Sequence, residues 1–488
     1  MNATSHDNLK HSALAQTFYP WIIWGLGCLF YFYEFFLQVS PSVMVPELMR
    51  DFSVTATQLG ILGSIYFYSY VIMQVPVGLL LDRFGPRKLL TLASIVCAAG
   101  SFLFGITHHF FIAEVARFMI GFGSAFALVG CFKIAADWFP SDRFALLAGL
   151  VITLGMSGAI VGESPLAFLI AKIHWRDSMV LFGFIGIIIS FLLLFIMKEH
   201  PHESPNQETT NVTKHFSLWQ SLKDFFSSII VGFLVFLIAI CIAVGGIFGQ
   251  SKKVQEFLLN MTHSMGHNMQ PILENFLKII TKKQIWLGAL YGGLVYTSTP
   301  AFTGLWGVPF LTQKYNIERP EAAAMVSIIF VGWLIGSPLF GWLSDRLRRR
   351  LPPMIIAAIG GLVSISTILY VSGISIWLMN ILLFAFGFFS SGFLPVFSLV
   401  RELSPKRSSG TAVAFTNMLN MLGVPITHTI IGILLDLTWH GQMADGIPVY
   451  TLHDYNIALC VFPITFILAI IILPFIKETY CRIVDDNE

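Results

Sequence analysis

The sequence predicts an all-α polytopic membrane protein built from two six-helix pseudo-repeats with a central helical insert. Of the 488 residues, 56% are hydrophobic and only 11% are charged, and the mean hydropathy is +0.75, whereas a soluble chain carries about 25% charged residues. The apolar residues fall into runs of about 20 residues, the length that crosses a bilayer core. A short motif with a basic cluster occurs twice, at 78–88 and 341–350, which indicates a duplicated unit.

The apolar runs form two sets of six on either side of a central segment. Each run is expected to be helical, because every backbone amide inside lipid must be hydrogen-bonded within its own segment. Residues 1–197 and 285–488 each form a six-helix bundle, and 198–284 separates them. The predicted spans are 20–43, 57–80, 88–107, 112–137, 145–171 and 179–197 in the first half, and 285–312, 321–343, 354–372, 376–400, 410–435 and 455–476 in the second.

The central segment contains a polar linker followed by two predicted helices. Residues 198–224 form the linker, 225–249 an apolar helix, and 252–283 an amphipathic helix. A single extra crossing would put the second copy of the motif on the other side of the membrane, so the insert crosses zero or two times. We favour a two-helix hairpin over a helix on the membrane surface, although burying the ionisable side chains of 252–283 has a cost.

Basic residues indicate the orientation of the chain. With both termini in the cytoplasm, the short cytoplasmic segments outside the insert contain 14 Lys or Arg residues and the opposite loops contain five. Cytoplasmic loops of membrane proteins carry the excess of Lys and Arg. We therefore expect both termini and both motif copies to lie in the cytoplasm.

The two copies of the motif lie in register. Asp82 and Asp345 are 263 residues apart, and Arg143 and Arg407, in a second pair of similar segments, are 264 residues apart. The first copy comprises Gly78, Asp82, Arg83, Gly85 and Arg87, and the second keeps Gly341, Asp345 and Arg346. This duplicated pattern resembles the major facilitator superfamily, in which G-x-x-x-D-R-x-G-R-[RK] joins the second and third spans of a half.

The resemblance implies the major facilitator fold and a cytoplasmic gate at the motif. By the resemblance, Asp82 and Asp345 each lie against the N-terminal end of a helix in the opposite half, where a helix dipole stabilises a carboxylate by ~0.3–1 kcal/mol. These contacts would close the cytoplasmic side and break when the halves rock. The alternative is a plain basic anchor at the membrane surface, which does not require Asp at matched positions.

Three ionisable residues lie inside spans of the first half: Glu34, Arg117 and Glu163. Glu34 lies ~21 Å from the cytoplasmic end of its span and Arg117 ~8 Å below the opposite surface, at 1.5 Å per residue, so their depths coincide in a core of about 30 Å. We expect all three to meet in one cavity and to couple transport to protons. Glu34 is the best candidate for the proton site because aromatic residues surround it. The alternative is a static buried ion pair that fixes helix packing.

The remaining cavity candidates are mostly neutral. They are Tyr31, Gln38, Lys133, Tyr291, Tyr296, Trp306, Asn417, Asn420 and His428. Lys133 is either a partner for a substrate carboxylate or a side chain that reaches the interface. Asn417, Asn420 and His428 can share one helix face, and the aromatic residues are alternatively core packing. Charge in the first half and neutral polar groups in the second half are the division expected of a proton-coupled importer.

Further resemblances refine the function. Arg117 begins R-F-M-I-G-F-G, which is similar to the superfamily's fourth-span motif linked with proton coupling. The fifth span matches the Gly-Pro motif of drug antiporters only in part, which weakens an exporter reading. Segments 30–49 and 290–311 resemble the proteobacterial intraphagosomal amino acid transporter group. This implies uptake of an amino acid, or of a nucleoside or small peptide, across a bacterial inner membrane.

Other classes of protein fit less well. The chain has no G-x-x-x-x-G-K-[ST] phosphate-binding loop and no cluster typical of a nucleophile or metal site, so we expect no enzyme activity, metal or cofactor. The expected partners are a small-molecule substrate, protons and the lipid bilayer, with no nucleic acid and a monomeric chain. The alternatives left open are an exporter of a small organic molecule and a membrane sensor that does not transport.

Overall fold

The computed structural model describes residues 3–140, 143–198, 279, 282–404, 409–444 and 446–482. The predicted helices of the insert, 225–249 and 252–283, lie outside the described residues except at the end of the second. The first half contains α1 (Ala3–Val39), a 3-10 turn η1 (Ser40–Val43), α2 (Val45–Phe52), α3 (Ala56–Phe84), α4 (Pro86–Ile106), α5 (Phe110–Trp138), α6 (Phe144–Ile170) and α7 (Trp175–Ile196).

The second half begins with α11 (Lys283–Ala301), a π-helical turn η3 (Phe302–Trp306), α12 (Gly307–Tyr315), α13 (Arg319–Leu347), α14 (Leu351–Tyr370) and α15 (Ile376–Ser390). It continues with a 3-10 turn η4 (Ser391–Phe393), α16 (Pro395–Glu402), α17 (Ser409–Thr438), the short strands β1 (Met443–Ala444) and β2 (Ile447–Pro448), α18 (Leu452–Ala458), α19 (Val461–Ile472) and η6 (Leu473–Phe475). The antiparallel strands pair Met443 with Pro448 and Ala444 with Ile447.

The helices confirm the predicted fold class. Among the described residues, ten helices or continuous helical runs are long and apolar enough to cross a membrane. The remaining two predicted spans correspond to α3 and to the run from α11 to α12. These two carry many tyrosine, serine and threonine residues, and α3 packs along α17 of the other half.

Three predicted spans are interrupted where proline or a change of helical pitch intervenes. The run 285–312 is broken by η3 directly after Pro300, and 376–400 by η4 before Pro395. The first span ends at Val39, and η1 with Pro41 follows it. Proline removes a backbone donor and clashes with the preceding turn, so it ends or distorts a helix. A π-helical turn inside a helix is frequently found at a functional site.

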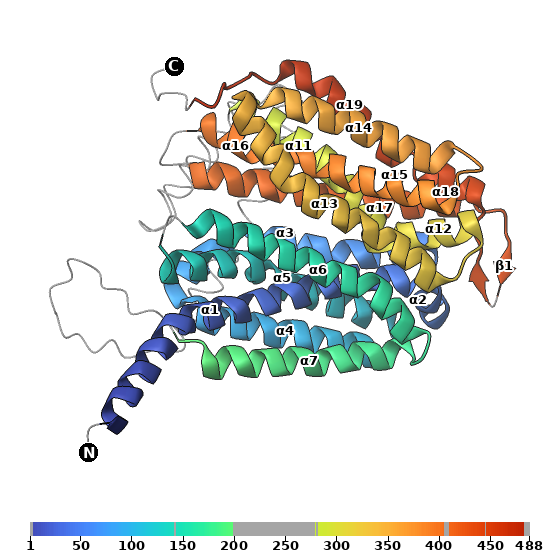
Figure 1. Ribbon diagram of the computed structural model, residues 1–488. Coiled ribbons are helices and arrows are strands. Elements are labelled where there is room, and N and C mark those ends of the chain that lie inside the picture. Colours follow the sequence, from blue (N-terminus) through green and yellow to red (C-terminus); the bar gives the residue numbers. More distant parts are fainter. Residues whose placement is uncertain are drawn as a thin grey trace, which may run out of the picture.

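Figure 1 shows the two bundles side by side, with α3 next to α17 and α6 next to α13 across the boundary between them. We call the end of the molecule at which α1 begins and α3 ends the proximal end. The opposite end, which carries α2, α12 and the two strands, is the distal end.

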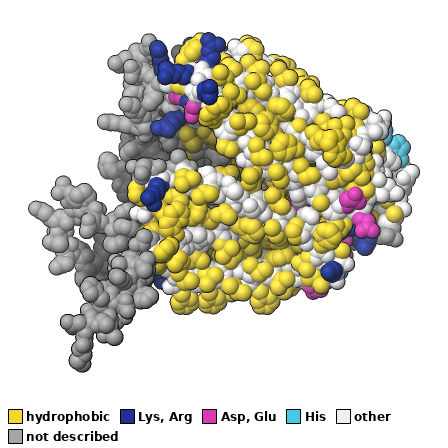
Figure 2. Space-filling view, viewed as in Figure 1, with side chains coloured by type: hydrophobic (Ala, Val, Ile, Leu, Met, Phe, Trp, Pro, Cys, Tyr) yellow, Lys and Arg dark blue, Asp and Glu magenta, His cyan; other side chains and the backbone are white. Residues whose placement is uncertain are grey.

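An apolar belt surrounds the middle of the molecule. In Figure 2 hydrophobic side chains cover the face between the two ends, and the charged side chains lie mainly toward the ends. The most exposed members of the belt include Phe111, Phe168, Phe184, Phe195, Trp342 and Trp377. An apolar surface of this extent suits a hydrocarbon environment.

Each motif copy contains a residue with a positive φ at the turn. Gly85, after α3, has a φ of 78°, and Arg348, after α13, has a φ of 50°. Residues 85 and 348 occupy matched positions of the duplicated pattern. A positive φ suits glycine and is uncommon for other residues. The ψ angles differ, at 158° for Gly85 and 34° for Arg348, so the second half replaces a conformation that is essentially restricted to glycine by the left-handed helical one.

Candidate functional site

Glu34 lies on α1 and is buried among helices of the first half, with 2% of its surface exposed. The Tyr66 hydroxyl group on α3 donates a hydrogen bond to Glu34 Oε1 at 2.5 Å. Glu34 Oε2 has no hydrogen-bond partner among the described residues. A buried charge without sufficient donors is costly. One carboxyl oxygen of Glu34, Oε1, therefore accepts a hydrogen bond, and the other, Oε2, is available to carry a proton.

Arg117 lies on α5 and is 1% exposed. Its Nη1 donates a hydrogen bond to the Leu37 carbonyl oxygen at 3.0 Å, and its guanidinium carbon lies 4.9 Å from the centre of the Tyr66 ring. Leu37 belongs to the last turn of α1, where carbonyl groups lack partners within the helix. In the described part of the chain no ion pair joins Arg117 to Glu34 or Glu163. Tyr66 contacts Glu34 and Arg117 and so connects them.

Glu163, on α6, is fully buried and belongs to a different hydrogen-bonded group. The Ser42 hydroxyl group in η1 donates to Glu163 Oε2 at 2.9 Å, and Oε1 has no partner among the described residues. This bond ties α6 to the turn that follows α1. The three ionisable residues expected in one cavity thus form two groups, one around Tyr66 and one around Ser42.

A cavity lies between the two halves. With its open mouth it measures about 330 Å³. Its lining comes from α1 and α6 of the first half and from α11, η3 and α13 of the second: Phe35, Gln38, Val39, Met156, Tyr296, Thr299, Pro300, Thr303, Phe330 and Trp333. Gln38 and Tyr296 are the two predicted cavity residues in this lining. Gln38 lies one helical turn after Glu34 on the same face of α1.

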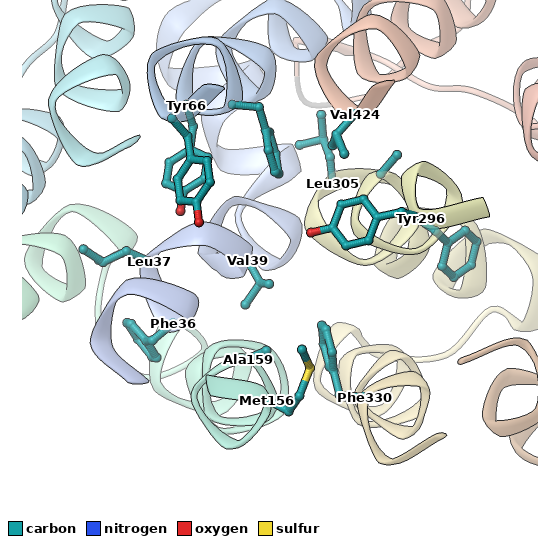
Figure 3. Packing of buried hydrophobic residues seen from close by; sticks show 14 of the residues in the cluster. Phe36, Leu37, Val39, Tyr66, Met156, Ala159, Tyr296, Leu305, Phe330 and Val424 are labelled. Atoms are coloured by element: carbon teal, nitrogen blue, oxygen red, sulfur yellow. The ribbon is translucent and has the colours of Figure 1, made fainter. Parts of the chain in front are cut away.

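Figure 3 shows how the two halves face each other at this level. The Tyr296 hydroxyl group points from the second half toward the first, on the side where Tyr66 lies. Met156 and Phe330 approach one another between α6 and α13. The cavity is therefore bounded by side chains that belong to different halves and would separate if the halves moved apart.

Seven predicted cavity residues do not line the cavity, and four of these lie outside α17. Three are engaged by a neighbour in their own half: Tyr31 by the Phe35 ring at 5.0 Å between ring centres, Lys133 by Asp137 at 3.5 Å, and Tyr291 by the Met354 carbonyl oxygen at 2.6 Å. Trp306 is buried in η3. Their contacts are those of helix packing in this conformation.

The other predicted residues of the second half lie along α17. Asn417 Nδ2 donates to Gln74 Oε1 on α3 at 3.0 Å, which joins the two halves. His428 is buried edge-to-face against the Phe67 ring of α3, at 5.7 Å between ring centres. Asn420 is buried in its own half beside Gly292. The shared face expected for Asn417 and His428 is therefore an interface between the halves.

The second motif copy lies at the proximal end and forms a cluster of charged side chains. Arg350 Nη1 donates to Asp345 at 2.6 Å, and Arg350 Nη2 donates to Glu402 on α16 at 2.5 Å. The Thr479 hydroxyl group donates to the same Glu402 carboxylate at 2.5 Å. Asp345 is thus engaged within its own half, and the Arg346 guanidinium group stacks on a tryptophan of the same helix.

The first copy of the motif shows a related use of a basic side chain. Arg87 donates to the Leu194 carbonyl oxygen near the end of α7, at 2.7 Å from Nη2. Gly78 has open space around the position of a Cβ atom. The side chains of Asp82 and Arg83 lie outside the described residues, so their gate role stays a prediction.

The distal end holds two further links between the halves. Asp436, near the end of α17, accepts hydrogen bonds from backbone N–H groups at the start of α3. Arg319, at the start of α13, donates to Glu47 on α2 at 2.6 Å and to the Val43 carbonyl oxygen at 3.1 Å. The halves are therefore joined by polar contacts at the distal end of their boundary.

Sequence reasoning missed Tyr66, Ser42 and the threonines of the cavity. Tyr66 belongs to Y-F-Y-S-Y at 66–70, and Thr299 to T-S-T-P at 297–300. These polar and tyrosine-rich stretches lie inside two of the least apolar spans. They are the sequence feature that could have indicated the additional site residues. The sequence predicts charged partners for the buried carboxylates, whereas the structure supplies hydroxyl groups.

Two helical bundles around a cavity at their boundary, within an apolar belt, are the architecture of a multi-pass membrane transporter. The chain belongs to the Major Facilitator Superfamily, whose model matches residues 25–308 and 285–480.

Two of the similar proteins are named as transport proteins. The chain is 25% identical over 421 residues to the uncharacterized transporter YybO of Bacillus subtilis, which covers 83% of this chain and 85% of that protein. It is 24% identical over 434 residues to a probable hexose phosphate transport protein of Chlamydia muridarum, with 84% of each chain covered.

Among solved structures, an inward-facing bacterial homologue of the human lysosomal transporter Spinster matches with a TM-score of 0.65. The match covers 95% of this chain and 96% of that one at 14% identity. At this level of identity the likeness concerns the fold alone.

Proposed function

We propose that this chain is a secondary active transporter that couples uptake of an amino acid, or a similar small polar metabolite, to proton movement by alternating access. The observation that supports the proposal most is the buried Glu34 carboxyl group, which has Tyr66 as its hydrogen-bond donor and lies one turn from cavity residue Gln38. Ionisable residues inside membrane helices typically mark substrate or proton paths.

The two carboxyl groups have different surroundings, and this favours Glu34 as the proton site. Tyr66 contacts both Glu34 and Arg117, and Arg117 is hydrogen-bonded to α1. A change in the charge of Glu34 therefore alters the electrostatic environment of Arg117. Glu163 is bonded to Ser42 in the turn after α1. Protonation of Glu34 would weaken the hydrogen bond that the Tyr66 hydroxyl group donates to it, since hydrogen bonds to a charged acceptor are stronger than those to a neutral one.

The fifth span departs from the Gly-Pro motif of drug antiporters, and this favours uptake over export. Glu163 stands directly after Gly162, where the drug-antiporter motif has no acidic residue, and Pro165 is displaced. The resemblance of 30–49 and 290–311 to amino acid transporters supports the choice of substrate. An amide and a phenol in the cavity suit a polar metabolite.

The proposed setting is a bacterial inner membrane, with the proximal end in the cytoplasm and the chain as a monomer. Support comes from the basic residues described near the proximal end, among them Arg87, Arg346, Arg348 and Arg350. The distal loops contain fewer, which follows the positive-inside distribution.

Uptake into proteoliposomes tests the proposal. The purified chain is reconstituted and supplied with labelled amino acids, with and without an inward proton gradient. The gradient should drive accumulation by the native chain, and Glu34→Gln should abolish accumulation while keeping counterflow exchange, because exchange needs no net proton movement. Glu114→Gln is the matched control, since Glu114 is a carboxyl residue on α5 outside the site. Accumulation by Glu34→Gln with normal pH dependence would contradict the assignment.

A further inference from the structure

The lining of the cavity contains no charged side chain. All ten residues are uncharged in the part of the chain that the structure describes. Phe35, Phe330 and Trp333 supply aromatic rings, and Met156 and Val39 supply aliphatic surface. A solute in this cavity therefore meets mainly apolar walls.

The cavity lining contains few polar groups, and some of them are hydrogen-bonded to each other. The Thr303 hydroxyl group donates to the Thr299 carbonyl oxygen at 3.0 Å, and Trp333 Nε1 donates to Thr299 Oγ1 at 3.4 Å. Gln38 and Tyr296, each 8% exposed, make no hydrogen bond to another described residue. A carboxamide and a phenol thus remain to bind the solute, and both are neutral donors and acceptors.

Buried Arg117 and half-buried Lys133 of the first half are engaged elsewhere. Arg117 is bonded to the Leu37 carbonyl oxygen and stacked on Tyr66, and Lys133 is paired with Asp137. Neither residue belongs to the cavity lining. The nearest ionisable group along α1 is Glu34, one turn before Gln38, and it repels an anion when it is charged. A phosphate or dicarboxylate would lose its hydration here without gaining a cationic partner, which is unfavourable.

From this lining we infer that the transported solute carries no net negative charge and has an apolar or aromatic part, with its polar group held by Gln38 and Tyr296. The inference rests on the proposed transport function and narrows its substrate. A zwitterionic or uncharged molecule fits these requirements. An organic phosphate, the substrate class named for the Chlamydia muridarum relative, does not.

Equilibrium binding to the full-length purified chain tests the inference separately from proton coupling. Matched pairs that differ in charge are titrated: L-phenylalanine with N-acetyl-L-phenylalanine, L-leucine with N-acetyl-L-leucine, and uridine with uridine monophosphate. Thermal stabilisation and intrinsic tryptophan fluorescence are the readouts. The neutral or zwitterionic member should bind about tenfold tighter or more in every pair that binds, because the anion leaves its charge unpaired. Equal or tighter binding by an anionic member, or the absence of binding by every neutral member, overturns the inference.

A variant with an added charge gives an independent readout. Gln38→Arg should gain binding of the anionic members, whereas Gln38→Met should weaken binding of the neutral members without that gain. If Gln38→Arg does not fold, Thr303→Arg introduces the positive charge at another residue of the cavity lining. No gain of anion binding in a folded arginine variant would contradict the inference. Binding of neutral solutes without proton-driven uptake would refute the transport proposal and leave the inference about charge intact.

Discussion

Asp436 of the second half caps the N-terminus of α3 in the first half: its Oδ1 accepts a hydrogen bond from Ala56 N at 3.1 Å and its Oδ2 from Thr57 N at 2.9 Å. The first N–H groups of a helix have no partner within the helix, and its dipole favours a negative charge there. The Tyr450 hydroxyl group donates to Asp436 Oδ1 at 2.6 Å. Burial raises the pKa of Tyr450, and the Asp436 carboxylate raises it further, so this donor stays protonated.

This contact is of the kind that the sequence predicted for Asp82 and Asp345, a carboxylate against the end of a helix in the other half. It occurs at the distal end, however, whereas the motif lies at the proximal end. In a transporter whose halves rock, a distal cap of this kind stabilises the conformation that is closed at the distal end.

Asp436→Ala should therefore destabilise the distal-closed conformation. Loss of a helix cap costs about 1–2 kcal/mol, which corresponds to a shift of roughly 5- to 30-fold in the ratio of the two conformations. A cysteine at Val39 in the cavity should react faster with an impermeant thiol reagent added from the distal side. Asp177→Ala is the matched control, because Asp177 lies in the first turn of α7 within one half. Equal reactivity in both variants would show that the cap does not hold the halves together.

Tyr66→Phe should impair proton coupling without removing the carboxyl group. The change keeps the ring beneath Arg117 and deletes the donor to Glu34, a hydrogen bond to a charged group worth about 1.5–3 kcal/mol. We expect gradient-driven uptake to fall by roughly tenfold or more and its pH dependence to change. Tyr33→Phe is the control, since the Tyr33 hydroxyl group is also buried but donates to the Phe182 carbonyl oxygen. A pH profile of Tyr66→Phe identical to that of Tyr33→Phe would exclude a coupling role for Tyr66.

Glu402→Gln should lower stability far more than Asp345→Asn. Both carboxylates contact Arg350, but the side chain of Glu402 is 10% exposed and that of Asp345 is 73% exposed. Breaking a buried pair costs about 3–5 kcal/mol, whereas an exposed pair contributes about 0–1 kcal/mol. Thermal unfolding of the purified variants in detergent measures the difference. Similar losses in the two variants would mean that Asp345 contributes more than its exposure indicates.

The duplicated fold was predictable because its signals are local. Apolar run length and the repeated Gly-Asp-Arg pattern are properties of short segments, and most predicted spans agree with the helices within a few residues, whereas α1 begins at Ala3 and its predicted span at 20. The breaks at η1, η3 and η4 were not predicted, although Pro41, Pro300 and Pro395 stand at or beside them. A proline inside a membrane helix can be accommodated by its neighbours, so its presence alone does not determine where the helix breaks.

The site was only partly predictable because its partners are set by tertiary packing. Position along the span predicts a similar depth for Glu34 and Arg117, but it does not indicate which side chain lies between them. Tyr66 is supplied by α3, which packs against α5 of its own half and α17 of the other half. In the same way, Asn417 was expected to face a cavity and instead bonds to Gln74 across the boundary.

Close backbone contact between α3 and α17 leads to the last prediction, Gly60→Ala. A Cβ atom at Gly60 would lie 2.5 Å from the His428 carbonyl oxygen, and one at Gly432 would lie 2.4 Å from the Ala56 carbonyl oxygen. Backbone atoms cannot yield without moving a helix, so an alanine at Gly60 forces the halves apart at the distal end. The substitution should therefore favour the distal-open conformation.

Spin labels at Lys172 and Asn316, at distal positions of the first and second halves, measure this effect by their distance distribution. Gly60→Ala should increase the population at long distances, and Gly149→Ala should leave it unchanged. Gly149 is the matched control because no other atom lies within 4 Å of its Cβ position; alanine there should add about 0.5–1 kcal/mol of helix stability. An unchanged distribution in folded Gly60→Ala would mean that α3 and α17 stay in contact while α3 shifts within its own half.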